Sequence, residues 1–156
     1  MKIGIIPARG GSKRIPRKNI MPFAGKPIIA WTIEAALESG LFDRLIVSTG
    51  IIEVVQHAIG WSVENGDDIE YVCCMLATAP FLQAEALSQA LQQLSESDAS
   101  YAFSVTAFPF PIQRAIRISP ENRVEAIWPE NIPRRSQDLE EAFHDAGQVY
   151  WGTRAA

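Results

Sequence analysis

The chain holds little cysteine and no long run of apolar residues. Its only cysteines are the neighbours Cys73 and Cys74. On a strand their side chains would point to opposite faces, which argues against a disulfide between them and against a zinc site. No apolar stretch approaches the ~20 residues of a membrane-spanning helix, and Pro7 and Arg9 interrupt the N-terminal one, unlike in a secretory leader. We therefore expect a cytoplasmic protein that does not associate with a membrane.

Acidic residues are missing from the start of the chain. No Asp or Glu precedes Glu34, yet half of the fourteen basic residues stand in this stretch: Lys2, Arg9, Lys13, Arg14, Arg17, Lys18 and Lys26. Protein surfaces normally mix both signs of charge, so a basic cluster around glycines indicates a site for a polyanion. A chance basic surface is the alternative. The net charge of -4 for the whole chain argues against a general nucleic-acid-binding protein.

The apolar residues alternate between strand and helix patterns up to residue 106. The expected strands are 2–6, 44–48, 70–75 and 101–106, and the expected helices open at Lys26-Pro27, at 52 and at 83 and end before Gly40, at 64 and at 96. This order predicts an α/β fold with a mostly parallel sheet and helices on both faces. Beyond Phe108 we expect short strands and loops. A chain of 156 residues with 47% hydrophobic composition fits one domain over 1–156.

The loop between the first strand and the first helix, PARGGSKRIPRKN at 7–19, carries the chemistry. Ligands of open α/β sheets bind at the carboxyl ends of the strands. Gly10 and Gly11 allow a tight turn whose N–H groups face an anion. Arg9 and Lys18 are able to neutralise a triphosphate, and Ser12 and Asn19 to donate hydrogen bonds to it. The loop matches neither the Walker A pattern nor the dinucleotide fingerprint.

This loop and the GKPIIAWTI that follows it resemble the N-terminal signature of the cytidylyltransferases that activate sialic-type sugars. The resemblance continues through FDRLIVST, YVCCMLATAPF, FSVTAFPFPIQRAIRI and RSQDLEEAFHDAGQVYWG, and the later blocks are most similar to the pseudaminic acid branch. It implies a Rossmann-like, glycosyltransferase-A-like nucleotidyltransferase sheet flanked by helices. It also implies CTP and an acidic sugar as partners, Mg²⁺ as cofactor and a homodimer as the assembly.

The resemblance also assigns roles to residues of this chain. Arg9 and Lys18 become the catalytic residues that stabilise charge in the transition state. The nucleotide contacts are Ala8, Gly10, Gly11, Ser12 and Asn19. The sugar side comprises Thr78, Gln113, Arg114, Arg135, Gln137 and Tyr150. Leu76 and Ala77 depart from the polar or aromatic residues expected before Thr78, which puts a direct sugar contact there in doubt.

Two pieces of the family pattern are absent. Relatives carry an Asp after the IVST strand, then a helix and a strand with an Arg-Pro that helps to read the base, whereas Gly50 follows Thr49 here. Either the chain breaks between 49 and 50 or the deletion is real. Relatives also carry metal-binding aspartates after the YWG block, so we expect that the C-terminal part is missing after 156. The Mg²⁺ ligands are then expected outside this chain, with no metal ligand within it.

The predicted reaction is the transfer of CMP from CTP to a nine-carbon 2-keto acid sugar with release of pyrophosphate. The resemblance prefers pseudaminic acid over N-acetylneuraminic acid, and a wall of Phe108, Phe110, Pro111 and Tyr150 would suit this less polar sugar. One alternative is a cytidylyltransferase for the eight-carbon lipopolysaccharide sugar, and another is a non-catalytic nucleotide-binding remnant. No general base is identifiable.

Several other side chains have simpler interpretations. Helical spacing groups His57 with Val54 and Trp61, which favours a packed or surface histidine over a ligand. We expect Trp31, Trp61 and Phe103 in the core.

Overall fold

The computed structural model describes residues 1–11, 15–49 and 52–155. They divide into two compact units, unit 1 with Met1–Ser104 and Gly147–Ala156, and unit 2 with Val105–Ala146. Each unit is described by itself. The expectation of one domain over 1–156 therefore stays a prediction, and the suspected break between Thr49 and Gly50 involves a residue outside the described ranges.

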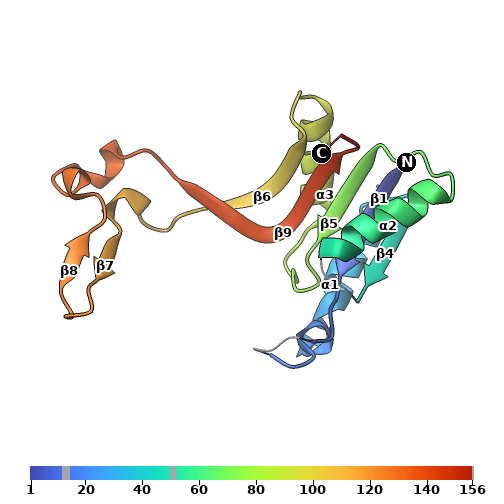
Figure 1. Ribbon diagram of the computed structural model, residues 1–156, viewed down its shortest axis with the longest axis horizontal. Coiled ribbons are helices and arrows are strands. Elements are labelled where there is room, and N and C mark those ends of the chain that lie inside the picture. Colours follow the sequence, from blue (N-terminus) through green and yellow to red (C-terminus); the bar gives the residue numbers. More distant parts are fainter. Residues whose placement is uncertain (12–14, 50–51, 156) are drawn as a thin grey trace. The chain divides into compact units, whose positions relative to one another are not determined.

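Unit 1 is built on a five-stranded sheet in the order β4-β1-β5-β9-β6 (Figure 1). The strands are β1 (Lys2–Pro7), β4 (Arg44–Ser48), β5 (Tyr71–Met75), β6 (Tyr101–Ala107) and β9 (Phe143–Thr153). β1 pairs in parallel with β4 and β5, whereas β9 pairs antiparallel with β5. The sheet is therefore mixed. The α/β class is confirmed, and the expected parallel arrangement holds for β1, β4 and β5.

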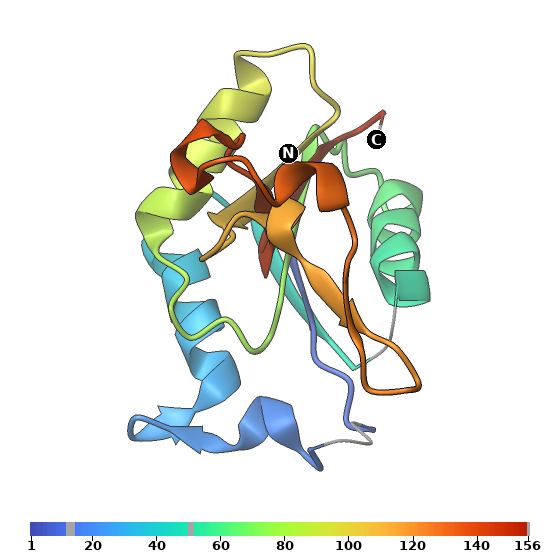
Figure 2. The same ribbon diagram turned by 90° about the vertical axis from the view of Figure 1, so that its left-hand side faces the viewer.

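Helices cover the sheet of unit 1 on both faces, as Figure 2 shows. They are α1 (Ile28–Glu38), α2 (Ile52–Glu64) and α3 (Ala84–Ser95), close to the expected ranges. Alternate residues of β1 serve the two faces: Ile3 and Ile5 pack with Ala58 of α2, and Ile6 packs with residues of α1 and α3. None of the described helices is long and apolar enough to cross a membrane.

Local sequence explains where these helices form. Pro27 precedes α1 with φ -55, a value that suits a helix start, and Gly40 follows with φ 62, the left-handed conformation that ends many helices. α3 turns Leu87, Leu91 and Leu94 into the core at helical spacing. The expectation that Trp61 and Phe103 are core residues is wrong, because their exposed fractions are 49% and 51%.

A short excursion connects β1 to α1. It contains the 3-10 helix η1 (Lys18–Ile20) and the small strands β2 (Pro22–Phe23) and β3 (Lys26–Pro27), which pair antiparallel. Trp31 of α1 is half-buried and contacts this excursion, with its Nε1 donating to the Phe23 carbonyl at 3.0 Å.

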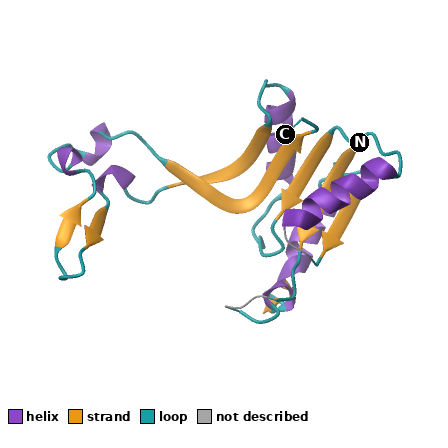
Figure 3. Ribbon diagram, viewed as in Figure 1, coloured by secondary structure: helices purple, strands orange, loops and turns teal. Residues whose placement is uncertain are grey.

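Unit 2 consists of short elements, drawn in Figure 3 as small strands and helical turns. They are η2 (Ile112–Arg114), β7 (Ile116–Ile118), β8 (Val124–Ala126), η3 (Pro129–Asn131) and η4 (Ser136–Asp138). β7 and β8 form an antiparallel hairpin. The expected change of pattern beyond Phe108 is confirmed. The sequence did not indicate the long strand β9 over Phe143–Thr153.

Candidate active site

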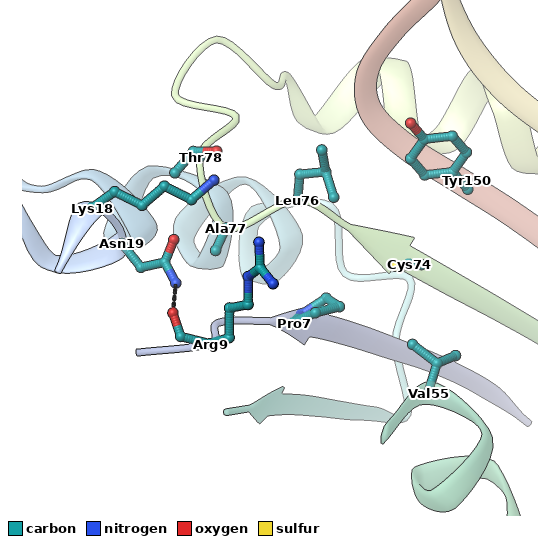
Figure 4. Close-up of a pocket in the computed structure, with 10 residues that line it drawn as sticks. All are labelled: Pro7, Arg9, Lys18, Asn19, Val55, Cys74, Leu76, Ala77, Thr78 and Tyr150. Atoms are coloured by element: carbon teal, nitrogen blue, oxygen red, sulfur yellow. Dashed lines mark hydrogen bonds between the residues drawn. The ribbon is translucent and has the colours of Figure 1, made fainter. Parts of the chain in front are cut away.

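A cavity of about 470 Å³ opens in unit 1 beside the ends of β1 and β5 (Figure 4). Pro7 is the last residue of β1, and the turn that follows β5 begins at Leu76. The lining residues are Pro7, Arg9, Lys18, Asn19, Val55, Cys74, Leu76, Ala77, Thr78 and Tyr150. The carboxyl ends of two parallel strands therefore form its floor, where ligands of open α/β sheets bind.

Two cationic side chains reach this cavity from opposite ends of one loop. Arg9 is the second residue after β1, and Lys18 opens η1. Figure 4 shows both side chains directed toward the Leu76–Thr78 turn. Within the described ranges, no ion pair joins either of them to a carboxylate. Two positive charges without a neutralising partner attract an anion to this end of the cavity.

Asn19 joins the two ends of this loop. Its side chain lies next to Lys18, is only 7% exposed, and its Nδ2 donates to the carbonyl oxygen of Arg9 at 3.0 Å. Arg17 precedes η1 in the left-handed conformation with φ 53, an uncommon state that reverses the chain.

The glycine pair leaves open space around the loop. A Cβ atom at Gly10 or Gly11 would meet no heavy atom within 4 Å of the described chain. The backbone is therefore accessible to a ligand at both positions. The N–H of Ala8 donates to the carbonyl of Ser48, which ties the end of β1 to the end of β4. Ser12 lies outside the described residues, so its predicted contact stays a prediction.

The opposite end of the cavity is apolar. Val55, Cys74, Leu76 and Tyr150 line it, and Cys74 stands opposite Tyr150 in the β5–β9 register. The Tyr150 ring stacks on Phe103 of β6 with centroids 6.2 Å apart. Burial raises the pKa of the Cys74 thiol above its ordinary value. The thiol is therefore neutral near pH 7 and supplies no thiolate nucleophile.

Thr78 lies in a turn that α1 holds in place. The hydroxyl of Thr32, a fully buried residue of α1, donates to the Leu76 carbonyl at 3.0 Å. Leu76 and Ala77 line the cavity together with Thr78. Sequence reasoning missed Thr32, Val55 and Cys74 at this site, because apolar and helical patterns do not reveal which of their members border a cavity.

The remaining predicted sugar contacts lie in unit 2, namely Gln113, Arg114, Arg135 and Gln137. The Arg114 guanidinium donates to the Arg134 carbonyl, and the Gln113 Nε2 donates to the Glu140 carbonyl at 2.9 Å. The Gln113 Oε1 is buried without a hydrogen-bond partner among the described atoms. The structure thus brings Arg9, Lys18, Asn19, Thr78 and Tyr150 together, and the sugar role of the unit 2 residues stays a prediction.

The described residues do not form a magnesium site on their own. No group of three His, Cys, Asp or Glu side chains within the described ranges is arranged to hold a metal, and no carboxylate lines the cavity. Mg²⁺ prefers oxygen ligands in octahedral geometry. The residues at the Arg9 end of the cavity do not fit this ion.

Known proteins resemble this chain in both sequence and fold. Residues 3–64 match the cytidylyltransferase family. The chain is 39% identical to the pseudaminic acid cytidylyltransferase of Campylobacter jejuni subsp. jejuni serotype O:23/36 (strain 81-176) over 181 residues, which cover 97% of this chain and 78% of the relative. It is 29% identical to the N-acylneuraminate cytidylyltransferase B of Danio rerio, covering 99% of this chain and 42% of that protein.

The solved structure of CMP:2-keto-3-deoxy-manno-octonic acid synthetase, complexed with CTP, has the same fold. It superposes with a TM-score of 0.67 at 18% identity, covering 99% of this chain and 74% of that chain. The alignment with the Campylobacter jejuni relative spans 181 residues, 25 more than the 156 of this chain, so the relative contains at least that many residues without a counterpart here. The match over nearly the whole chain, together with the glycine loop that precedes α1, shows that this chain belongs to the cytidylyltransferase family.

Proposed function

We propose that this protein transfers CMP from CTP to pseudaminic acid, a nine-carbon 2-keto acid sugar, and releases pyrophosphate. One observation carries the proposal. Arg9 and Lys18 converge on a cavity at the carboxyl ends of β1 and β5, without a carboxylate partner among the described residues. A triphosphate supplies the negative charge that such a pair lacks.

In the proposed reaction, negative charge develops on the phosphate oxygens that Arg9 and Lys18 would contact. The anomeric hydroxyl oxygen of the sugar attacks the α-phosphorus of CTP, and the bond from that phosphorus to the bridging oxygen breaks. Pyrophosphate leaves with the electron pair. Arg9 and Lys18 neutralise the charge that develops on the phosphate oxygens, which is the main requirement of such a transfer. The residue that accepts the hydroxyl proton is not assigned.

The nucleotide contacts follow from the same loop. The backbone N–H groups at Gly10 and Gly11 and the side chains of Ser12 and Asn19 are the proposed partners of the phosphates and ribose. Ala8 is a proposed nucleotide contact through atoms other than its N–H, which donates to the Ser48 carbonyl. Mg²⁺, which cytidylyltransferases typically use, would add charge neutralisation on the phosphates when bound. Because the described residues do not fit this ion, none of the steps above is assigned to it.

The proposed sugar contacts include residues of unit 1 and residues of unit 2. Thr78 and Tyr150 line the cavity beyond the two cations. In unit 2, the buried Oε1 of Gln113 has no partner among the described atoms, and an unpaired buried acceptor is costly unless a donor, such as a sugar hydroxyl, satisfies it. Arg114 or Arg135 would pair with the sugar carboxylate, and Gln137, which follows Arg135 by two residues, is the remaining proposed sugar contact.

The preference for pseudaminic acid rests on the relatives. Its cytidylyltransferase from Campylobacter jejuni is 39% identical over 97% of this chain, against 29% over 99% for N-acylneuraminate cytidylyltransferase B of Danio rerio. The wall expected from Phe108, Phe110, Pro111 and Tyr150 is only partly supported. The first three line a small cavity within unit 2, whereas Tyr150 belongs to unit 1.

A homodimer is the proposed assembly. Unit 2 exposes many large apolar side chains, including Phe110 at 79%, Ile118 at 69% and Val124 at 66%. Concentrations of exposed apolar residues mark protein–protein contact surfaces. A second copy of this chain is the proposed occupant.

A second candidate function is a non-catalytic nucleotide-binding protein. The observation that favours it is the set of at least 25 residues that the Campylobacter jejuni relative has and this chain lacks. If part of that set forms the nucleotide-reading segment, this protein would bind CTP without turning it over.

A pyrophosphate-release assay decides among these functions. The protein is supplied with CTP, Mg²⁺ and one sugar at a time: pseudaminic acid, N-acetylneuraminic acid or the eight-carbon lipopolysaccharide sugar. The proposal expects the fastest release with pseudaminic acid. Faster release with another sugar would reassign the substrate, and CTP binding without release from any sugar would establish the second candidate.

A further inference from the structure

Asn19 is one of few buried polar residues in unit 1. Its side chain is 7% exposed, and it donates from Nδ2 to the Arg9 carbonyl, ten residues earlier, at 3.0 Å. Figure 4 shows the bond as a dashed line, with the amide oxygen of Asn19 turned away from Arg9. A buried amide group bonded to a distant backbone carbonyl holds two segments of the chain together.

This bond also controls the glycine pair. The carbonyl of Arg9 and the N–H of Gly10 belong to one planar trans peptide group, so they point in opposite directions. By holding the carbonyl, Asn19 fixes the direction of the Gly10 N–H. Packing against the described part of the chain does not fix it, since no described heavy atom lies within 4 Å of a Cβ placed at Gly10 or Gly11. The Asn19 amide is therefore the described contact that orients this peptide.

Asn19 is itself well anchored. It lies within η1, which packs against α1, and the turn into η1 is closed by the Ile20 N–H, which donates to the Arg17 carbonyl at 3.0 Å. The preceding residue is Lys18, the second cation of the cavity. One side chain therefore links Arg9, at the start of the loop, to Lys18, at its end.

We propose that Asn19 is a positioning residue for the phosphate site. It holds the Arg9–Gly10 peptide at a fixed place relative to Lys18, so that both cations and the first glycine N–H are arranged before the anion binds. A preorganised site loses less conformational entropy on binding than one that must order its loop. The proposal rests on the proposed function only for the identity of the anion, the triphosphate of CTP.

The first test needs no ligand. Asn19→Leu removes the hydrogen-bond donor, keeps a similar side-chain size and adds no charge. Asn19→Asp is the second variant, in case the leucine variant does not fold, because aspartate also lacks the donor and has the same shape as asparagine. Asn65→Leu is the matched control, because the Asn65 Nδ2 donates to the Trp61 carbonyl at 2.7 Å and does not line the cavity. The 15N order parameter of the Gly10 amide, measured by NMR relaxation, should fall toward the values of a flexible loop in both Asn19 variants and stay unchanged in the control. An unchanged order parameter in both Asn19 variants would overturn the proposal.

The second test separates positioning from direct contact with the nucleotide. CTP affinity is measured by calorimetry for Asn19→Leu, Arg9→Ala and the double variant. Asn19→Leu should weaken binding about tenfold, and part of this loss should disappear when Arg9 is already alanine, because the Arg9 side chain is then no longer there to be positioned. Full additivity would show that Asn19 acts on the nucleotide only by its own contact and would overturn the positioning role. If the unmodified protein binds no CTP, the proposed function fails, while the measurement on the free protein still decides the role of Asn19.

Discussion

The two units of the molecule differ in the extent to which they bury their apolar side chains. Unit 1 contains every buried hydrophobic residue of the described ranges, among them Leu87 and Trp151. In unit 2, Phe110, Ile118 and Val124 are all more than 60% exposed. Unit 1 therefore has a core that can hold a ligand-binding loop in a fixed geometry. Unit 2 carries apolar surface that a protein partner would bury.

The largest expected effect tests the core of unit 1. Leu87 is fully buried among residues of α1, α3 and the sheet, so Leu87→Ala removes buried methyl groups and leaves a cavity. Stability should fall by about 2–5 kcal/mol in urea denaturation. Ile118→Ala is the control in unit 2, where the side chain is 69% exposed, and it should change stability by less than about 0.5 kcal/mol. Equal losses would remove the contrast between the units.

The next effect concerns the cations of unit 1. Arg9→Ala and Lys18→Ala should each lower the rate of pyrophosphate release about a hundredfold, the scale of losing one charge-stabilising group. Arg117→Ala removes an equally cationic but exposed side chain of unit 2, which pairs with Glu125, and should leave the rate within about twofold. Near-normal rates in both cavity variants would withdraw the catalytic assignment.

A smaller effect is expected from the surface of unit 2. If a second copy covers Ile118 and Val124, the double substitution Ile118→Asp and Val124→Asp should weaken self-association about tenfold or more, because it places charges in an apolar contact. Sedimentation velocity at several protein concentrations measures this. Unfolding of unit 1 should be nearly unaffected. Unchanged association would direct the search for the dimer contact to another surface.

The smallest effect concerns the thiols of β5. Burial, and then the neighbouring Cys74, raise the pKa of Cys73 well above its ordinary value, so the folded state holds its proton more tightly than the unfolded chain. The resulting stability is complete below the unfolded thiol pKa of about 8.5 and is lost as pH rises above it toward the folded pKa. Stability should therefore decline at alkaline pH, and more weakly in Cys73→Ser than in the unmodified protein. An identical pH dependence would contradict the pKa assignment.

Cys74 offers a chemical comparison with its neighbour. Cys74 is half-buried and lines the cavity, whereas Cys73 is buried in the core. Iodoacetamide should therefore modify Cys74 before Cys73, and CTP should slow the modification if it occupies the cavity. Mass spectrometry of the peptides locates the label. Equal labelling with and without CTP would indicate that the nucleotide does not extend to the Cys74 end.

Periodicity predicted most of unit 1. α2 and β4 have the expected bounds, and α1 and α3 begin and end within about two residues of them, a usual uncertainty for helix ends. β9 was missed because Gly147, with φ 64, and polar residues such as His144 and Asp145 interrupt its pattern. The solvent exposure of individual side chains was harder to predict than the helices and strands. Phe103 alternates like a core residue, yet it lies on β6 at the edge of the sheet, is 51% exposed, and its ring stacks on Tyr150.

The site was predictable only in part. The lack of acidic residues before Glu34 and the glycine pair predicted an anion site at this loop, and Arg9, Lys18 and Asn19 do line one cavity. The hydrogen bond from Asn19 to Arg9 was not foreseeable, because an asparagine in a basic loop could equally face the ligand. The apolar end was not foreseeable either, since Val55 and Leu76 come together only when α2 and the turn after β5 pack on the same sheet.

The most direct test of the phosphate site is a calorimetric titration with CTP, CDP, CMP and cytidine. Each ligand has the same base and ribose, so differences in affinity report on the phosphates alone. If Arg9 and Lys18 hold the triphosphate, affinity should fall at each step of the series, with the steepest losses as the β- and γ-phosphates are removed. Equal affinity for CTP and cytidine would contradict a phosphate site at this loop.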